Sequence, residues 1–285
     1  MRRLLGPLGL LLLGLPIAIM ALIEFEIRRS GLGDRPHYRA DSVIGYIPRP
    51  SQHGQFANTV EWSFNERSMR NAGPFRPDAS ARDILLIGDS LVFGRHYEAA
   101  TPGPELARAS GTQVWPIAAP SWGLANELTY LELNPDVARS VDDIIFVVGS
   151  EDFGPASFWV NDYMHLRGRP RSYALYWLAS QFLMGRDSDA IPVTDRGPLA
   201  ERLERLRQQT RARILFLYYP TKDELASGKP CAFVPQLLRA YPVYCLGLDP
   251  EWSAGFYEDN IHPRADASPL LGRAIARGLK AAGQR

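Results

Sequence analysis

The stretch that decides the fold runs Ile84-Leu85-Leu86-Ile87-Gly88-Asp89-Ser90-Leu91-Val92-Phe93-Gly94. It opens with a short apolar run that has the length and composition of a buried strand, and the run stops at Gly-Asp-Ser. A serine at the mouth of a buried strand, with a helix following, is placed for nucleophilic attack. Near the far end, Asp259-Asn260-Ile261-His262-Pro263 puts a carboxylate three residues before a histidine. One loop can therefore supply a general base and the group that orients it.

The chain from Asp83 onward alternates apolar runs with helical stretches, which is typical of a parallel α/β sheet. The expected strands are Ile84–Ile87, Gln113–Ile117, Ile144–Val148 and Ile214–Tyr219. Apolar spacing predicts a helix over Leu199–Arg211 and a closing helix that begins at Ser268-Pro269. Upstream, β-like pieces at Val43–Ile47 and Thr59–Phe64 predict a hairpin packed on the main fold.

These motifs resemble the blocks of SGNH (GDSL-type) hydrolases, which run Gly-Asp-Ser, then a glycine, then Gly-x-Asn-Asp, then Asp-x-x-His. The second block is similar to Val114–Gly123, with Gly123 in the place of the oxyanion glycine, and the third is similar to Gly149-Ser150-Glu151-Asp152. The stretch Asn65–Arg70 resembles a lead-in of bacterial membrane-attached members. The resemblance covers roughly residues 41–282 and implies a flavodoxin-like, doubly wound parallel sheet.

The resemblance also implies a role for each site residue. Ser90 is expected to attack an ester carbonyl, with His262 as the general base and Asp259 holding the imidazole. The backbone N–H groups of Ser90 and Gly123 are expected to stabilise the oxyanion. No metal or organic cofactor is expected.

Glu151 departs from the family pattern, which has an asparagine there that donates to the oxyanion. Loss of one such donor costs about 2.7–4 kcal/mol. In one interpretation, burial protonates Glu151 and makes it a donor through O–H. Alternatively it points away and Asn126 or Asn161 replaces it, or the site is weak or inactive. We favour displacement or impairment over a protonated donor.

The N-terminus predicts membrane attachment. Arg2-Arg3 precede Leu4–Ile23, an uncharged run long enough to cross a bilayer as a helix. The cleaner positive end lies at the N-terminus, which favours a single inner-membrane anchor with a periplasmic body. A cleaved signal peptide is the alternative. The expected division is residues 1–29 as the anchor, 30–82 as a tether and β-rich lead-in, and 83–285 as the hydrolase-like domain.

Composition narrows the remaining possibilities. A net charge of +1 without a basic block excludes a typical nucleic-acid-binding protein. Cys231 and Cys245 lack zinc-ligand spacing, and a disulfide and two separate buried thiols are both open.

The apolar patch Tyr173–Leu178 is expected to form a helix buried against the sheet, with a substrate lid or a membrane-surface face as alternatives. The other histidines are expected to be surface or core residues: His37, His53, His96 and His165.

The function expected from these observations is a serine esterase or O-acetyltransferase that works through an acyl-serine intermediate. Its substrate would be an acylated carbohydrate of the cell envelope or an exported polysaccharide, most readily an acetyl ester, and a membrane-bound acyltransferase is an expected partner. The alternative is a catalytically weak or inactive SGNH-like subunit that assists assembly of a polysaccharide synthesis or acetylation complex. Glu151 supports that alternative, and Ser90 with Asp259 and His262 speaks against it.

Overall fold

The core of the protein is a five-stranded parallel sheet. In the computed structural model, which describes residues 7–78, 80–94, 101–187 and 189–283, the strands lie in the order β6-β5-β7-β8-β9. Their bounds are Asp83–Gly88 (β5), Gln113–Ala118 (β6), Asp143–Val148 (β7), Arg213–Tyr218 (β8) and Val243–Cys245 (β9). Counted within this sheet alone, the order is 2-1-3-4-5, as in flavodoxin-like folds. The four expected strands and the parallel α/β sheet are confirmed.

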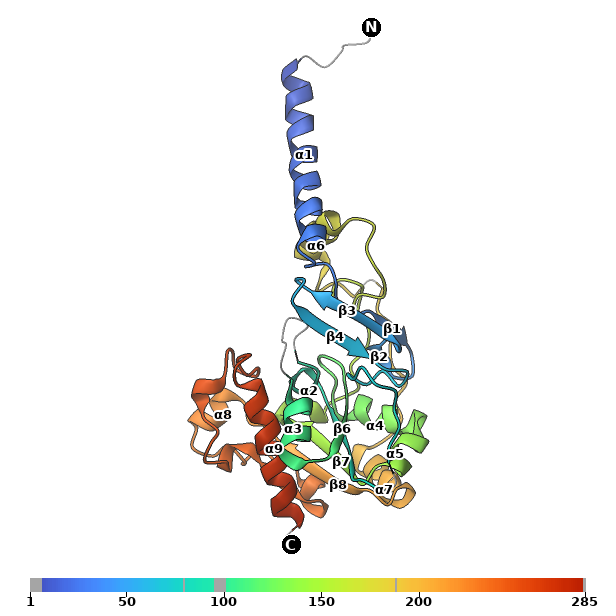
Figure 1. Cartoon of the computed structure of the whole chain (residues 1–285), viewed down its shortest axis with the longest axis vertical. Coiled ribbons are helices and arrows are strands. Elements are labelled where there is room, and N and C mark those ends of the chain that lie inside the picture. The colour runs from blue at the N-terminus through green and yellow to red at the C-terminus, as the bar shows by residue number, and fades with distance from the viewer. Residues whose placement is uncertain (1–6, 79, 95–100, 188, 284–285) are drawn as a thin grey trace.

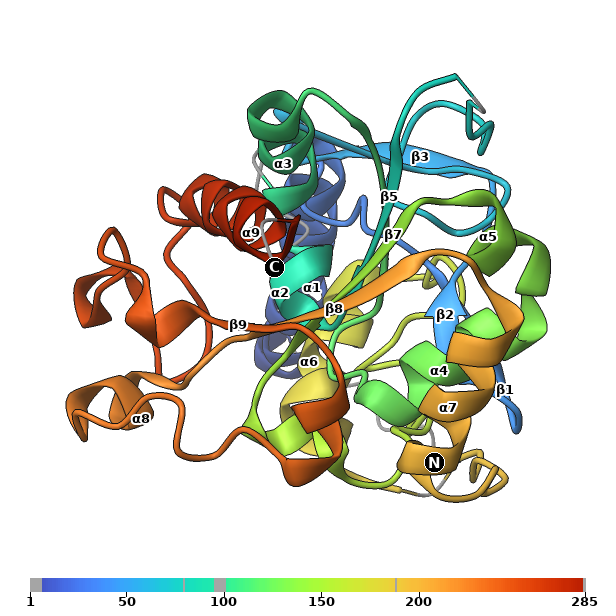
Figure 2. The ribbon, with the colours of Figure 1, turned by 90° about the horizontal axis from the view of Figure 1, so that it is seen from below.

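Helices cover both faces of the sheet (Figure 2). One face carries α2 (Ser90–Phe93), α3 (Pro102–Ser110) and α9 (Ser268–Gly283), and the other carries α4 (Leu124–Leu133), α5 (Pro135–Ser140) and α7 (Leu199–Gln209). Strands covered on both faces are largely apolar, and every residue of β5 and β7 is buried, with Asp83 and Asp143 as the only charged residues of these two strands. Helices α7 and α9 confirm the two helices expected in those regions.

The lead-in forms two antiparallel hairpins, so the prediction of a single hairpin is wrong. Strand β1 (Tyr38–Asp41) pairs with β2 (Gly45–Pro48), and β3 (Gln52–Phe56) pairs with β4 (Val60–Phe64). The expected piece Val43–Ile47 contains the turn of the first hairpin. Ser51, whose φ is 54°, lies between the two hairpins, and a turn at Ala57 and Asn58, with φ of 52° and 55°, joins β3 to β4.

The first hairpin supports the segment that contains Gly123. The Tyr46 hydroxyl donates to the Pro120 carbonyl at 2.6 Å, and the Trp122 indole N–H donates to the Tyr46 carbonyl at 2.8 Å. Tyr46 and Trp122 are both almost fully buried. The lead-in is therefore part of the structure that positions the site, because these bonds fix the loop after β6.

Helix α1 (Pro7–Arg29) stands out from the body as a single long helix (Figure 1). The first residues of the expected span, residues 4–6, lie outside the described part of the chain. Within residues 7–78, 80–94, 101–187 and 189–283, no helix combines the length and the apolarity needed to cross a membrane.

Helix α6 (Tyr173–Leu183) corrects another expectation, because it is not buried against the sheet. Its residues Leu175, Trp177 and Phe182 are exposed, and the helix packs against α1. Both faces of the sheet are already covered by other helices. The long connection after β7 therefore carries α6 to the end of the body from which α1 projects (Figure 1).

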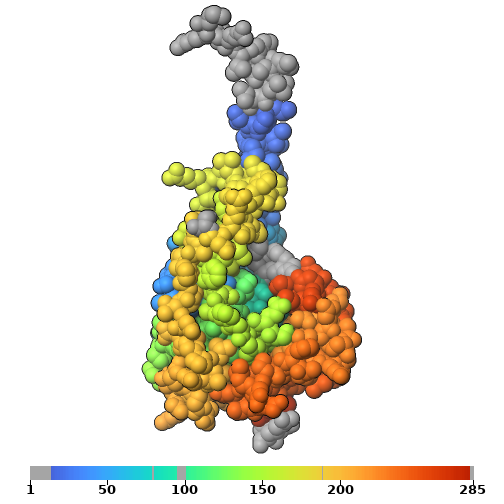
Figure 3. Space-filling view, turned by 180° about the vertical axis from the view of Figure 1, so that it is seen from behind, coloured from blue at the N-terminus to red at the C-terminus, as the bar shows by residue number. Residues whose placement is uncertain are grey.

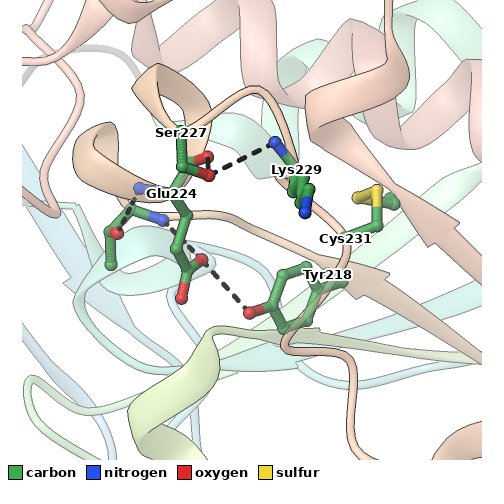
Figure 4. The surroundings of a disulfide bond; sticks show 7 residues. Tyr218, Glu224, Ser227, Lys229 and Cys231 are labelled. Atoms are coloured by element: carbon green, nitrogen blue, oxygen red, sulfur yellow. Dashed lines mark hydrogen bonds between the residues drawn. A yellow bond between two sulfur atoms is a disulfide. The ribbon is translucent and has the colours of Figure 1, made fainter.

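Cys231 and Cys245 form a disulfide, with their Cα atoms 6.1 Å apart (Figure 4). This decides between the two alternatives left open by the sequence. The bond ties the segment after α8 (Lys222–Ala226) to the end of β9. Helix α8 itself is held to β8, because the Tyr218 hydroxyl donates to Glu224 Oε2 at 3.1 Å.

Candidate active site

Ser90 lies directly after β5, where the strand turns into α2. The Asp89 side chain caps this helix by accepting a 2.8 Å hydrogen bond from the Leu91 N–H. Strands β6 and β7 flank β5 in parallel, so the loops that follow all three strands emerge at the same edge of the sheet. The fold thus gathers the Ser90, Gly123 and Gly149 segments at this edge.

Ser90, His262 and Asp259 form a continuous hydrogen-bonded chain. Ser90 Oγ lies 3.0 Å from His262 Nε2, and His262 Nδ1 lies 2.8 Å from Asp259 Oδ2. The two distances match the order nucleophile, base and orienting carboxylate. Residues 172 positions apart therefore meet in the arrangement that the sequence predicts.

Asp259 is held as a carboxylate by its own loop. Burial opposes its ionisation, but the backbone N–H groups of His262 and Ile261 and the His262 ring outweigh this and lower the pKa of Asp259 to about 2. Those N–H groups donate to Asp259 Oδ1 at 2.7 and 2.8 Å. An ionised Asp259 fixes the imidazole with Nδ1 protonated, which leaves Nε2 as the acceptor for the Ser90 proton.

The histidine loop is attached to the segment that follows β8. The Lys222 N–H donates to the Asn260 carbonyl at 2.8 Å, and the Asp223 N–H donates to Asn260 Oδ1 at 3.1 Å. The Tyr257 hydroxyl donates to the Pro220 carbonyl. The carboxyl end of β8 therefore positions His262 through backbone contacts, and Lys222 itself is exposed.

Gly123 occupies a place that only glycine fits. It precedes α4, and a Cβ at this residue would lie 2.9 Å from the Asp152 carbonyl oxygen. The Gly123 N–H makes a long, 3.3 Å hydrogen bond to Asn126 Oδ1. The loops after β6 and β7 are thus in close contact.

Asn126 and Asn161 are structural residues, so the expectation that one of them replaces the oxyanion donor is wrong. The Asn126 amide donates to the carbonyls of Ile44 and Ser157 at 2.9 and 2.7 Å and is fully buried. The Asn161 amide donates to three carbonyls that follow α6, those of Leu183, Met184 and Arg186. Neither amide has an N–H left for a substrate.

Glu151 is exposed in the turn η1 (Ser150–Phe153) that follows β7. The burial on which an O–H donor at this position would depend is therefore absent. The turn is fixed by its neighbour Asp152, whose Oδ2 accepts a 2.6 Å hydrogen bond from the Gly149 N–H. An exposed carboxylate supplies no N–H to a developing oxyanion.

A group of carboxyls that sequence reasoning missed lies beneath the site. Glu127 on α4 is 0% exposed, and neither of its oxygens has a hydrogen-bond partner in the described structure. Burial, followed by the charges of Asp152 and Asp89, raises the pKa of Glu127 well above its usual range. Burial and the Asp89 charge raise the pKa of Asp152 to about 8. A glutamate in an amphipathic helix ordinarily faces solvent, so no sequence signal distinguishes Glu127.

The remaining histidines do not approach the triad through any contact described here. His165 is buried and stacks on Tyr46 with ring centroids 3.8 Å apart, and burial lowers its pKa to about 4. His53 is exposed and His37 is partly buried, while His96 lies outside the described residues. Among the residues that are described, no three or more His, Cys, Asp and Glu side chains gather so that they could hold a metal ion.

One face of the body is hollowed (Figure 3). Figure 3 shows this hollow between the orange and red C-terminal segments and the yellow-green segment after β7, with green segments at its floor.

No protein-family model and no curated protein matches the chain. Solved structures that resemble it include a member of the lipolytic protein G-D-S-L family from Veillonella parvula DSM 2008, at 14% identity and a TM-score of 0.36, covering 72% of this chain and 100% of that one. The C-terminal catalytic domain of peptidoglycan O-acetyltransferase A from Streptococcus pneumoniae is 10% identical, with a TM-score of 0.35 and coverages of 72% and 93%. A carbohydrate esterase is 18% identical, with a TM-score of 0.37 and coverages of 74% and 67%. Because these scores are low, we base the proposals below on sheet order and site geometry.

Proposed function

We propose that the protein is an SGNH-type serine esterase or O-acyltransferase. The observation that carries this proposal is the hydrogen-bonded chain from Ser90 Oγ through His262 to Asp259, at 3.0 and 2.8 Å. Its position at the carboxyl edge of a 2-1-3-4-5 parallel sheet agrees with the family that the sequence motifs resemble.

The proposed reaction begins when Ser90 Oγ attacks the carbonyl carbon of an ester and His262 Nε2 takes the serine proton. The tetrahedral oxyanion is stabilised by the backbone N–H of Ser90 and by that of Gly123, which exchanges its long bond to Asn126 Oδ1 for the oxyanion. His262 then protonates the leaving alcohol, and an acyl-Ser90 ester remains. Attack by water completes hydrolysis, whereas attack by a second hydroxyl completes acyl transfer.

For the substrate we propose acyl esters, above all acetyl esters, of envelope or exported carbohydrate. The motif resemblance to membrane-attached members supports this class, together with a membrane anchor over Leu4–Ile23 and a periplasmic body. A membrane-bound acyltransferase is the partner proposed for the same setting.

A second candidate is an inactive SGNH-like assembly subunit, which the exposed Glu151 favours. Hydrolysis of 4-nitrophenyl acetate separates the two candidates. For the enzyme, Ser90→Ala and His262→Ala each lower kcat/KM by about a thousandfold or more, and the double variant is little worse than either. Ser140→Ala, at an exposed position on α5, is the matched control and should keep full activity. No difference between wild type and Ser90→Ala would favour the inactive subunit.

A further inference from the structure

Helix α6 presents an apolar surface that no described element covers. Leu175, Leu178 and Phe182 lie along one face at helical spacing and are 61%, 44% and 70% exposed. The helix sequence, Tyr-Ala-Leu-Tyr-Trp-Leu-Ala-Ser-Gln-Phe-Leu, contains no charged residue. An exposed apolar group of this kind marks a contact surface rather than ordinary scatter.

Glu24 fixes this helix at one level of α1. Its Oε2 accepts hydrogen bonds from the Ala174 N–H and the Ser172 hydroxyl, both at 2.9 Å, so it caps the start of α6 from another helix. The Arg28 guanidinium adds a 3.2 Å bond to the Arg171 carbonyl. Since the uncharged run of α1 ends at Ile23, α6 begins where that run stops.

A cavity of about 600 Å³ separates the two helices. Its walls include Ile23 and Ile27 from α1 and the aromatic residues Tyr173, Tyr176 and Trp177 from α6. Tyrosine and tryptophan concentrate at the level where the lipid headgroups meet the acyl chains. The walls are therefore those expected at a membrane interface.

The apolar surface continues from α6 onto α1. Leu22, Ile19 and Leu15 are exposed along α1 above the cavity, and they belong to the uncharged run Leu4–Ile23. Figures 1 and 3 show α6 at the base of α1, on the side of the body from which α1 projects. A phospholipid bilayer around that run would reach α6. Because the apolar surface of α6 continues that of α1, we infer that the bilayer is what covers α6.

We propose that α6 is an interfacial helix whose face Leu175, Leu178 and Phe182 lies in the headgroup and upper acyl region of the bilayer that holds α1. The inference rests on the proposed anchor and adds a second contact with the same membrane. Two contacts hold the body in one orientation, so the triad edge keeps a constant height above the lipid.

Trp177, in the wall of the cavity between α1 and α6, reports whether lipid reaches the level of α6. It is 51% exposed, whereas the other tryptophans are buried: Trp62, Trp115, Trp122, Trp159 and Trp252. The full chain is reconstituted in phosphatidylcholine–phosphatidylglycerol vesicles, with or without lipids brominated near the headgroup. We expect brominated lipid to quench part of the tryptophan emission, and Trp177→Phe to abolish that quenching. Trp252→Phe is the matched control and should leave it unchanged.

The outcomes separate this inference from the anchor. Protein that floats with the vesicles but shows no quenching by brominated lipid overturns the α6 contact and leaves the anchor in place. Quenching that persists in Trp177→Phe also overturns it. Protein that does not float at all refutes the anchor. If a second copy covers α6, Trp177 becomes shielded from acrylamide as protein concentration rises in detergent, without lipid quenching, and the bilayer is the wrong occupant.

Discussion

Glu151 is the residue at which this chain departs most clearly from a complete oxyanion site. Its carboxylate is exposed and has no N–H group that could donate to the oxyanion. The side-chain amides of Asn126 and Asn161 donate to backbone carbonyls elsewhere in the fold. In the proposed mechanism, the oxyanion is therefore stabilised by backbone N–H groups. One missing donor lowers the rate without removing the triad.

Glu151→Asn is expected to raise turnover of a small acetyl ester by roughly tenfold to a hundredfold. The amide adds an N–H and removes a negative charge, and both changes act on the transition state more than on bound substrate. The measurement is kcat for wild type, Glu151→Asn and Glu151→Gln across pH 5–9. Equal rates in all three proteins would mean that this side chain faces away from the oxyanion.

Asp152 is expected to make the fold less stable as pH rises. Its pKa in the folded protein is about 8, whereas an unfolded aspartate titrates near pH 4. Between these values the unfolded chain releases the proton and the folded protein keeps it, so the free energy of unfolding falls with rising pH. The slope for this one proton is at most about 1.4 kcal/mol per pH unit, and it ends above the folded pKa.

Asp152→Asn should flatten that slope, because the amide oxygen still accepts the Gly149 N–H and no charge forms. Urea unfolding of the full chain in detergent at pH 5 and pH 8 measures the difference. Glu61→Gln removes an exposed carboxylate on β4 that does not act on Asp152, and it should leave the slope as in wild type. A slope unchanged by Asp152→Asn would show that Asp152 is ionised throughout this range.

Among the elements, long buried strands could be predicted and short or surface elements could not. β5 and β7 are continuous apolar runs because both faces are covered, and that pattern is visible in the sequence. β9 has only three residues, and its place beside β8 depends on tertiary contacts. The prediction that α6 is buried against the sheet is wrong because an apolar sequence shows only that a helix avoids water. The sequence does not show what covers the helix.

The Cys231–Cys245 bond is expected to stabilise the α8–β9 segment. Closing a loop with a sequence separation of 14 residues contributes about 2–3 kcal/mol, chiefly by restricting the unfolded chain. The double variant Cys231→Ser/Cys245→Ser should lower the free energy of unfolding by this amount, measured in urea. Wild type treated with reductant should match the variant. Identical midpoints for oxidised wild type and the variant would contradict the bond.

At the scale of the whole molecule, the sequence predicted the triad but not its surroundings. Ser90, Asp259 and His262 could be assigned because parallel strands bring their carboxyl-end loops to one edge. The buried Glu127, and the amide contacts of Asn126 with the lead-in, depend on packing between distant segments. The spacing of residues along the chain does not predict such contacts.

The complete chain is expected to remain with membranes when they are washed with alkaline carbonate. The uncharged run Leu4–Ile23 is long enough to cross a bilayer as a helix, and α6 adds exposed apolar surface next to the C-terminal end of that run. Immunoblotting of the pellet and supernatant measures it, with a known peripheral protein as the control that is released. Recovery of the full chain in the supernatant would refute the anchor.

The central claim is that Ser90 is an activated nucleophile, and covalent labelling by a fluorophosphonate tests it most directly. We predict one adduct per chain, located by peptide mass spectrometry on Ser90, absent in Ser90→Ala, strongly slowed in His262→Ala and unchanged in Ser140→Ala. The hydrogen bond from Ser90 Oγ to His262 Nε2, at 3.0 Å, is the physical reason for this reactivity. A folded wild-type protein that acquires no adduct, or acquires it at another serine, would contradict the account.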